Sequence, residues 1–171
     1  MQALVAELWR LEGPAVENHI GDLAWQRFMH EGRESDWRIR LWDDAAWAWL
    51  RLPATLQYEI HPEHRSGALH DELIAWFEAE AAGDDLVTAC LSTDVERLAV
   101  LRRHGYEVNT DAREFAFHVC DLADIREPSV PNGYRLRTVE PDDLERRVDV
   151  HRAAFAPSRV TTESYANVMA A

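Results

Sequence analysis

The segment Tyr58–Trp76 changes its hydrophobic period midway, and this change constrains the fold more than any other feature of the chain. Residues 58–61 alternate as in a strand, whereas from Leu69 the apolar residues recur at helical spacing. Pro62, Arg65 and a short run of small residues separate the two patterns. A turn that feeds a helix start presents free backbone N–H groups and the positive end of the helix dipole. We therefore expect a strand, a turn suited to an anion such as phosphate, and a helix.

The length and charge of the chain limit its class. The 171 residues are enough for one domain and a remainder, and 47% apolar residues can fill a core. All 18 basic residues are arginine, and 31 acidic residues give a formal net charge of −13. Such a surface repels a phosphate backbone, and the basic pairs Arg102-Arg103 and Arg146-Arg147 are flanked by acids. We expect no nucleic-acid partner, whereas an amine ligand is compatible with the charge.

The two cysteines and the N-terminus indicate a compartment. Cys90 and Cys120 each lie within an apolar run, without a neighbour that would activate a thiol. We expect no signal peptide, and the sequence contains no apolar run of about 18 residues. We therefore expect buried free thiols in a reducing cytoplasm and no membrane partner.

The first sixty residues predict two helices followed by three antiparallel strands. Apolar residues at helical spacing predict helices over Ala3–Leu11 and Ile20–His30. Alternation over residues 37–42 and 46–52 predicts a hairpin in which each strand has one buried face. A third strand is predicted through Leu56–Ile60.

The middle of the chain predicts crossover connections. A helix runs from Leu69 to near Gly83, and the continuous apolar run Leu86–Leu91 predicts a strand buried on both faces. Thr93 and Glu96 have the spacing of a capping box that begins the next helix.

That helix is predicted to end at Gly105, because glycine is favoured just beyond a helix C-terminus. Tyr106–Val108 and Phe115–Val119 predict two further strands. The predicted fold class is α/β, with strands reached through helical crossovers.

After residue 126 the pattern is that of a new domain. Residues 127–133 form a linker with two prolines and an Asn-Gly pair, and Tyr134–Val139 alternates as a strand. A helix is predicted from Pro141, and a further helix around Thr162–Met169. The residues expected to face inward on the first of these helices are Leu144, Val148, His151 and Phe155. The predicted organisation is a domain over 1–126, a linker over 127–133 and an incomplete second domain over 134–171.

The segment 134–171 is too small to bury its own apolar face. We therefore expect it to dock on the first domain, pair in a dimer or fray.

The element order resembles the GNAT family of N-acetyltransferases. The residues that carry the resemblance are Pro62-x-x-Arg65 before the first crossover helix and Leu101-x-x-x-Gly105-Tyr106 after the next. The two segments together are similar to tandem members of the mycothiol synthase type, which carry two copies of the fold on one chain. The resemblance implies a mixed β-sheet with helices on both faces and acetyl-CoA as co-substrate.

In that family the pantetheine of acetyl-CoA lies between two splayed strands and pairs with the strand before the turn, here Tyr58–His61. The pyrophosphate is held by a turn with the pattern Arg/Gln-x-x-Gly-x-Gly/Ala. Arg65 matches the arginine, whereas Ala68 and His70 stand at the two glycine-type positions. The cofactor-binding residues that the resemblance implies are Ile60, His61, Arg65, Ser66, Gly67, Ala68, Leu69 and His70.

Several departures from the family pattern predict weak or lost acetyl-CoA binding. Side chains at Ala68 and His70 hinder close approach of the backbone to phosphate, although a protonated His70 could pair with it. Asp71 and Glu72 favour the helix start by about 0.3–1 kcal/mol each, but they repel a pyrophosphate. The tyrosine that protonates the leaving thiolate in relatives corresponds to Leu101, which carries no proton to donate.

The resemblance implies an N-acetyltransferase that acts on a small-molecule amine, if it is active. Glu59 is the candidate catalytic base, and the alternative for it is a solvent-facing strand carboxylate. The leading hypothesis is the N-terminal non-catalytic or substrate-shaping part of a tandem enzyme, with a missing C-terminal domain that docks on it. The alternatives are a non-catalytic acyl-CoA-binding or protein-interaction domain, and an active single-domain acetyltransferase.

The clustered histidines and the tryptophans are two further groups that can form sites in proteins. His61, His64 and His70 do not predict a metal site, because the HExxH spacing, a cysteine and a paired carboxylate are all lacking. Alternating tryptophans of the hairpin predict core packing. Trp25 is a candidate for the wall of a substrate groove.

Overall fold

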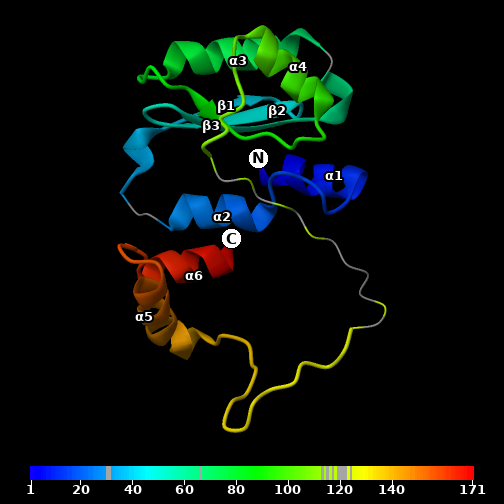
Figure 1. The fold of residues 1–171 in the computed structure, drawn as a ribbon. Helices are drawn as coiled ribbons and strands as arrows, with labels where there is room; N and C mark the ends of the chain where they lie inside the picture. Colours follow the sequence, from blue (N-terminus) through cyan, green and yellow to red (C-terminus); the bar gives the residue numbers. More distant parts are fainter. Residues whose placement is uncertain are drawn as a thin grey trace. The chain divides into compact units, whose positions relative to one another are not determined.

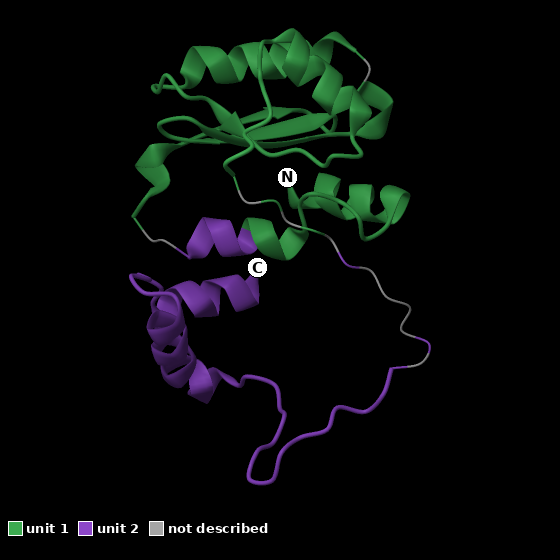
Figure 2. Ribbon diagram, viewed as in Figure 1, with its two compact units in different colours: residues 1–23, 32–116 green, residues 24–31, 117–171 purple. Residues whose placement is uncertain are grey.

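A computed structural model describes residues 1–29, 32–65, 67–112, 114, 116, 118, 123 and 125–171. The chain divides into two compact units (Figure 2). Unit 1 comprises Met1–Leu23 and Gly32–Ala116, and unit 2 comprises Ala24–Glu31 and Phe117–Ala171. The division falls within helix α2 (Ile20–Phe28). No helix among the described residues is both long and apolar enough to cross a membrane.

Unit 1 contains a four-stranded mixed sheet in the order β1-β2-β3-β4. Strands β1 (Trp37–Trp42), β2 (Ala46–Arg51) and β3 (Thr55–Ile60) are antiparallel, and β4 (Val87–Thr88) is parallel to β3. The hairpin turns at Asp43, whose φ of 48° lies in the left-handed region that aspartate tolerates. The α/β class and the three antiparallel strands are confirmed.

Helices lie on both faces of this sheet (Figure 1). Helix α3 (Ala68–Glu80) connects β3 to β4 and lies with α4 (Val95–Arg103) on one face, and α1 (Gln2–Glu12) lies on the other. Short 3₁₀ turns over Glu34–Asp36 and Pro62–His64 precede β1 and α3. The predicted helices of this unit are therefore confirmed.

The ends of α4 differ in part from the prediction. Asp94 caps the helix, because its side chain accepts a hydrogen bond from the Arg97 N–H at 2.9 Å, so the predicted capping box of Thr93 and Glu96 is wrong. At the other end Gly105 has a φ of 86° and donates to the Arg102 carbonyl at 3.0 Å. This confirms the predicted glycine stop.

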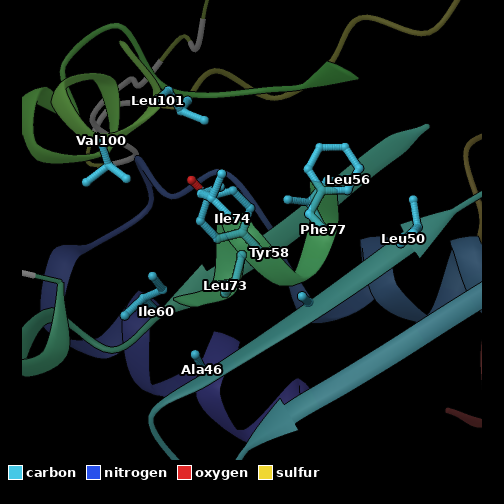
Figure 3. Close-up of a cluster of buried hydrophobic side chains, with 11 residues drawn as sticks. Ala46, Leu50, Leu56, Tyr58, Ile60, Leu73, Ile74, Phe77, Val100 and Leu101 are labelled. Carbon is cyan, nitrogen blue, oxygen red and sulfur yellow. The ribbon is translucent and has the colours of Figure 1, made fainter. Parts of the chain in front are cut away.

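The core between the sheet and helices α3 and α4 is apolar and continuous (Figure 3). Phe77 of α3 is fully buried, and Tyr58 of β3 is only 1% exposed. The cluster consists of Ala46, Ala48, Leu50, Leu56, Tyr58, Ile60, Leu73, Ile74, Phe77, Val100 and Leu101. Leu101, which the sequence resemblance aligns with a catalytic tyrosine of the GNAT family, is therefore a core residue.

The opposite face of the sheet packs against α1 and the first residues of α2. Trp47 and Trp49 of β2 are buried there with Val5 and Leu23. Strand β2 is thus covered on both faces, so the prediction of one buried face is wrong for this strand. The predicted packing role of these tryptophans is confirmed.

The edge strands are more exposed than their apolar patterns predict. Ile39 and Leu41 of β1 are 48% and 57% exposed, and Val87 of β4 is 51% exposed. The predictions of a buried face through Ile39 and Leu41 and of burial on both faces for Leu86–Leu91 are therefore wrong. The reason is position, since an edge strand has a neighbour on one side only.

Two predicted strands are absent from the described residues. Tyr106–Val108 and Tyr134–Val139 have no strand structure, and Tyr134 is 77% exposed. Alternation alone does not make a strand without a partner to pair with. The predicted strand Phe115–Val119 falls largely outside the described residues, as does Cys120.

Unit 2 is helical. A 3₁₀ turn over Pro141–Asp143 leads into α5 (Leu144–Ala154), and α6 (Thr162–Ala170) follows, which confirms both predicted helices. Their buried cluster is Leu144, Val148, Val160 and Tyr165, with Trp25 of α2 and Met29, just after that helix, packed against it. The ring centroids of Trp25 and His151 are 5.3 Å apart, so Trp25 has a packing role in this unit.

The prediction that Phe155 faces inward is wrong. This residue is 66% exposed, because the helix ends at Ala154.

Candidate functional site: an arginine–carboxylate pocket at the end of β3

Unit 1 contains a pocket of about 370 Å³ beside the C-terminal end of β3. Its walls come from the end of α1 and the loop that follows, from β3 and from the start of α4. Five acidic side chains and two arginines line it: Glu12, Glu17, Glu59, Asp94, Glu96, Arg65 and Arg97. Acidic groups are therefore in excess around two buried or half-buried guanidinium groups.

Arg97 is the centre of this site. It projects from α4, is only 5% exposed, and forms ion pairs with Glu17 and Glu59, the latter at 3.7 Å. Its Nη2 atom donates to the Tyr58 carbonyl at 2.5 Å, and its guanidinium lies 3.9 Å from the centroid of the Tyr58 ring. The buried Arg97 guanidinium thus contacts two carboxylates, a backbone carbonyl oxygen and the face of an aromatic ring.

Glu59 is buried, with 6% exposure, so the alternative of a solvent-facing carboxylate is wrong. The side chain of Asn18, from the loop after α1, covers it and donates from Nδ2 to Oε1 at 2.6 Å. Burial raises the pKa of Glu59, and the nearby Arg97 charge opposes that rise. Its role as a catalytic base stays a prediction.

Arg65, which the sequence resemblance matches to a phosphate-binding arginine, already has hydrogen-bond partners within unit 1. It forms a bidentate pair with Glu12 at 2.5 and 2.9 Å. Its Nε atom donates to the Ile60 carbonyl at 3.1 Å. The Arg65 guanidinium is therefore held by the end of β3 and the end of α1.

The edge of β3 that faces β4 is covered by these two arginines. The two strands pair only through Thr55 and Leu56, at the beginning of β3. Beyond that point the carbonyls of Tyr58 and Ile60 accept hydrogen bonds from Arg97 and Arg65. The sequence resemblance implies that pantetheine pairs with this segment.

The turn before α3 also differs from an anion site. Gly67 is the N-cap of the helix with a φ of −106°, a conformation open to any residue, and Ala68 and Leu69 begin its first turn. His70 is 2% exposed, and its Nε2 atom lies 2.8 Å from the Tyr58 hydroxyl. Burial lowers the pKa of His70 to about 4, so it is neutral near pH 7 and offers phosphate no positive charge. Ser66 lies outside the described residues.

Asp71, in the first turn of α3, and Glu72, the residue after it, have cationic partners. Asp71 pairs with Arg103 at 2.6 Å and with His104 at 3.0 Å. Glu72 pairs with Arg40 of β1 at 2.7 Å. Through these ion pairs the N-terminal part of α3 contacts the end of α4 and strand β1.

The structure thus brings Glu59 and Arg65 together at one pocket. The side chain of Ile60 lies in the core, with only its carbonyl accepting a hydrogen bond from Arg65, and His70 is buried as well.

Arg97 was not among the predicted site residues, because the apolar spacing of α4 predicts an inward face made of Val95, Leu98, Ala99 and Leu101, whereas Val95 is 71% exposed. The residues of that helix that are buried are Arg97, Val100 and Leu101, at positions i, i+3 and i+4. A helical face centred on Val100 would have included the arginine.

Cys90 shows no sign of a reactive thiol. It is a half-buried free cysteine, and burial raises its pKa to about 11. A thiol rather than a thiolate is therefore present at neutral pH, which agrees with the predicted free and unreactive cysteine.

Glu17 makes stability depend on pH. Burial raises the pKa of its carboxyl from 4.5 to about 7, while Arg97 opposes the rise and Glu59 and Asp94 add to it. Between pH 4.5 and about 7 the Glu17 carboxyl keeps its proton in the folded protein, whereas the unfolded chain has lost it. The resulting stability is fully present below the unfolded pKa and is lost as the pH rises through 7.

We expect the free energy of unfolding to fall between about pH 5 and about pH 8 by on the order of 2 kcal/mol more in the wild type than in Glu17→Gln. Urea denaturation across this range measures the difference. The matched control is Glu96→Gln, at an exposed position on the same pocket rim. Parallel pH profiles for Glu17→Gln and the wild type would contradict the assignment.

No family model, no curated protein and no solved structure matches this chain. The class that the fold and site define is a mixed α/β domain with a buried arginine–carboxylate network at one end of its sheet. The family resemblance of the sequence therefore stays a prediction.

Proposed function

We propose that unit 1 is a non-catalytic acetyltransferase-like domain that packs against or shapes the substrate site of a tandem acyltransferase. The observation that carries the proposal is the edge of β3. The Tyr58 and Ile60 carbonyls, which would pair with pantetheine in an active relative, are occupied by Arg97 and Arg65. Acetyl-CoA could pair there only by displacing a buried arginine from two carboxylates.

The topology supports the acetyltransferase part of the proposal. Three antiparallel strands are followed by the crossover helix α3 and by a parallel strand that pairs with β3 at one end only. This is the order that the resemblance implies, with the pocket at the end where the two strands do not pair.

Charge supports the non-catalytic part. A pyrophosphate needs positive charge or free N–H groups at the turn. Arg65 is neutralised by Glu12, and His70 is buried and neutral. Five acidic side chains around the pocket would repel the phosphates of the cofactor.

Calorimetric titration of the full chain with acetyl-CoA tests the proposal. We expect no saturable binding below the millimolar range, because the arginine contacts and the acidic wall must both be overcome. A parallel titration with ADP separates nucleotide binding in general from recognition of the thioester arm. Binding of acetyl-CoA in the micromolar range would contradict the proposal and favour an active acetyltransferase with Glu59 as its base.

A further inference from the structure

The connection between β3 and α3 gathers two histidines and a glutamate on a single short turn. His61 is the N-cap of the 3₁₀ turn Pro62–His64, and its Nδ1 atom accepts a hydrogen bond from the Glu63 N–H at 3.4 Å. Pro62 has a fixed φ that suits the first position of such a turn. Because a 3₁₀ turn repeats every three residues, His61 and His64 lie on the same side of it.

The three side chains present ligand atoms to one another. Each of the three residues, His61, Glu63 and His64, offers one potential ligand atom, and these three atoms all lie within 4.8 Å of one another. The His61 Nδ1 and Glu63 Oε2 atoms are 4.0 Å apart, and the two imidazole centroids are 6.0 Å apart. Ligand atoms at about 2.1 Å from one metal ion are roughly 3–4 Å from each other. Small side-chain rotations would therefore bring all three onto a single ion.

Two members of this set are exposed and the third, His61, is half-buried, and none of them lines the pocket beside β3. Glu63 has an 82% exposed side chain, and His64 is exposed. His104 provides the contrast, since its two ring nitrogens pair with different carboxylates, Asp71 at 3.0 Å and Glu78 at 3.4 Å. Those carboxylates lie at opposite edges of the ring and cannot converge on one ion.

We propose that His61, Glu63 and His64 bind a divalent transition-metal ion of the zinc class. Two imidazoles and one carboxylate are a common three-ligand set for zinc, and they leave a coordination position for water. The sequence expectation of no metal site considered His61, His64 and His70, whereas the structure removes His70 to the core and adds Glu63. The proposal is independent of acetyl-CoA binding.

The test uses the full untagged chain, treated with a chelator and then titrated with zinc chloride in a calorimeter near neutral pH. We expect one equivalent to bind with a dissociation constant in the micromolar range. His64→Ala and Glu63→Gln should each weaken binding at least about tenfold, since each removes one of three ligands. The matched control is His118→Ala, at an exposed histidine outside the cluster, which should bind zinc as the wild type does.

Two results would overturn the proposal. One is the absence of saturable zinc binding by the wild type. The other is binding by His64→Ala that equals that of the wild type, which would place the ion elsewhere. The substituted side chains are exposed, so circular dichroism should show that each variant folds, and a loss of affinity then reports on the ligand set.

Discussion

Replacing Arg97 with methionine is expected to lower the free energy of unfolding by about 3–5 kcal/mol near pH 7.5. Methionine fills a similar volume, but it leaves Glu17 and Glu59 buried without their cation. The Tyr58 carbonyl also loses its donor. An uncompensated buried charge costs more than the original pair contributes, so the loss should be large.

Urea denaturation followed by tryptophan fluorescence measures this effect, and Arg102→Met is the matched control at an exposed position on the same helix. The triple variant with Glu17→Gln and Glu59→Gln should recover most of the lost stability, because no buried charge is then left alone. Acidification should also restore the single variant in part, because protonation removes the same charges. A loss below about 1 kcal/mol would show that Arg97 is not the buried centre of the site.

Phe77→Ala is expected to lower the free energy of unfolding by about 3–5 kcal/mol. Its ring is fully buried between β2, β3 and α4, so truncation leaves a cavity that the sheet cannot close (Figure 3). The matched control is Phe155→Ala, because this phenylalanine is 66% exposed and should change stability by about 0.5 kcal/mol or less.

Thermal and urea unfolding of the two phenylalanine variants measure the contrast. Similar losses for both would mean that Phe155 is buried by a contact absent from the structure. A small loss for Phe77→Ala alone would contradict the position of α3 on the sheet.

Local patterns predicted the elements that have strong periodicity and a nearby packing partner. The helices over α1, α3, α5 and α6 and the hairpin β1–β2 follow from spacing and from turn residues. The wrong predictions are strands such as Tyr134–Val139, where alternation is present but a pairing partner is absent among the described residues. Strand formation depends on a neighbour elsewhere in the chain, which a local window does not contain.

The candidate site could be predicted only in part. Glu59 and Arg65 were found because they lie next to the turn that the pattern marks. Arg97 and Glu17 were missed because their ion pair joins residues 80 positions apart. Local periodicity also treats a charged residue as outward-facing, whereas Arg97 is stabilised inside by two carboxylates and an aromatic ring.

We infer that Arg97 and Arg65 close the edge of β3 to acetyl-CoA. Nuclear magnetic resonance of the full chain tests it most directly, through the Arg97 side-chain signals and the backbone amides of Tyr58 and Ile60. With acetyl-CoA added to millimolar concentration, we predict that these signals stay unchanged. Saturable shifts confined to Tyr58, Ile60 and Arg97 would show that the cofactor displaces the arginine and that the edge of β3 is open to it.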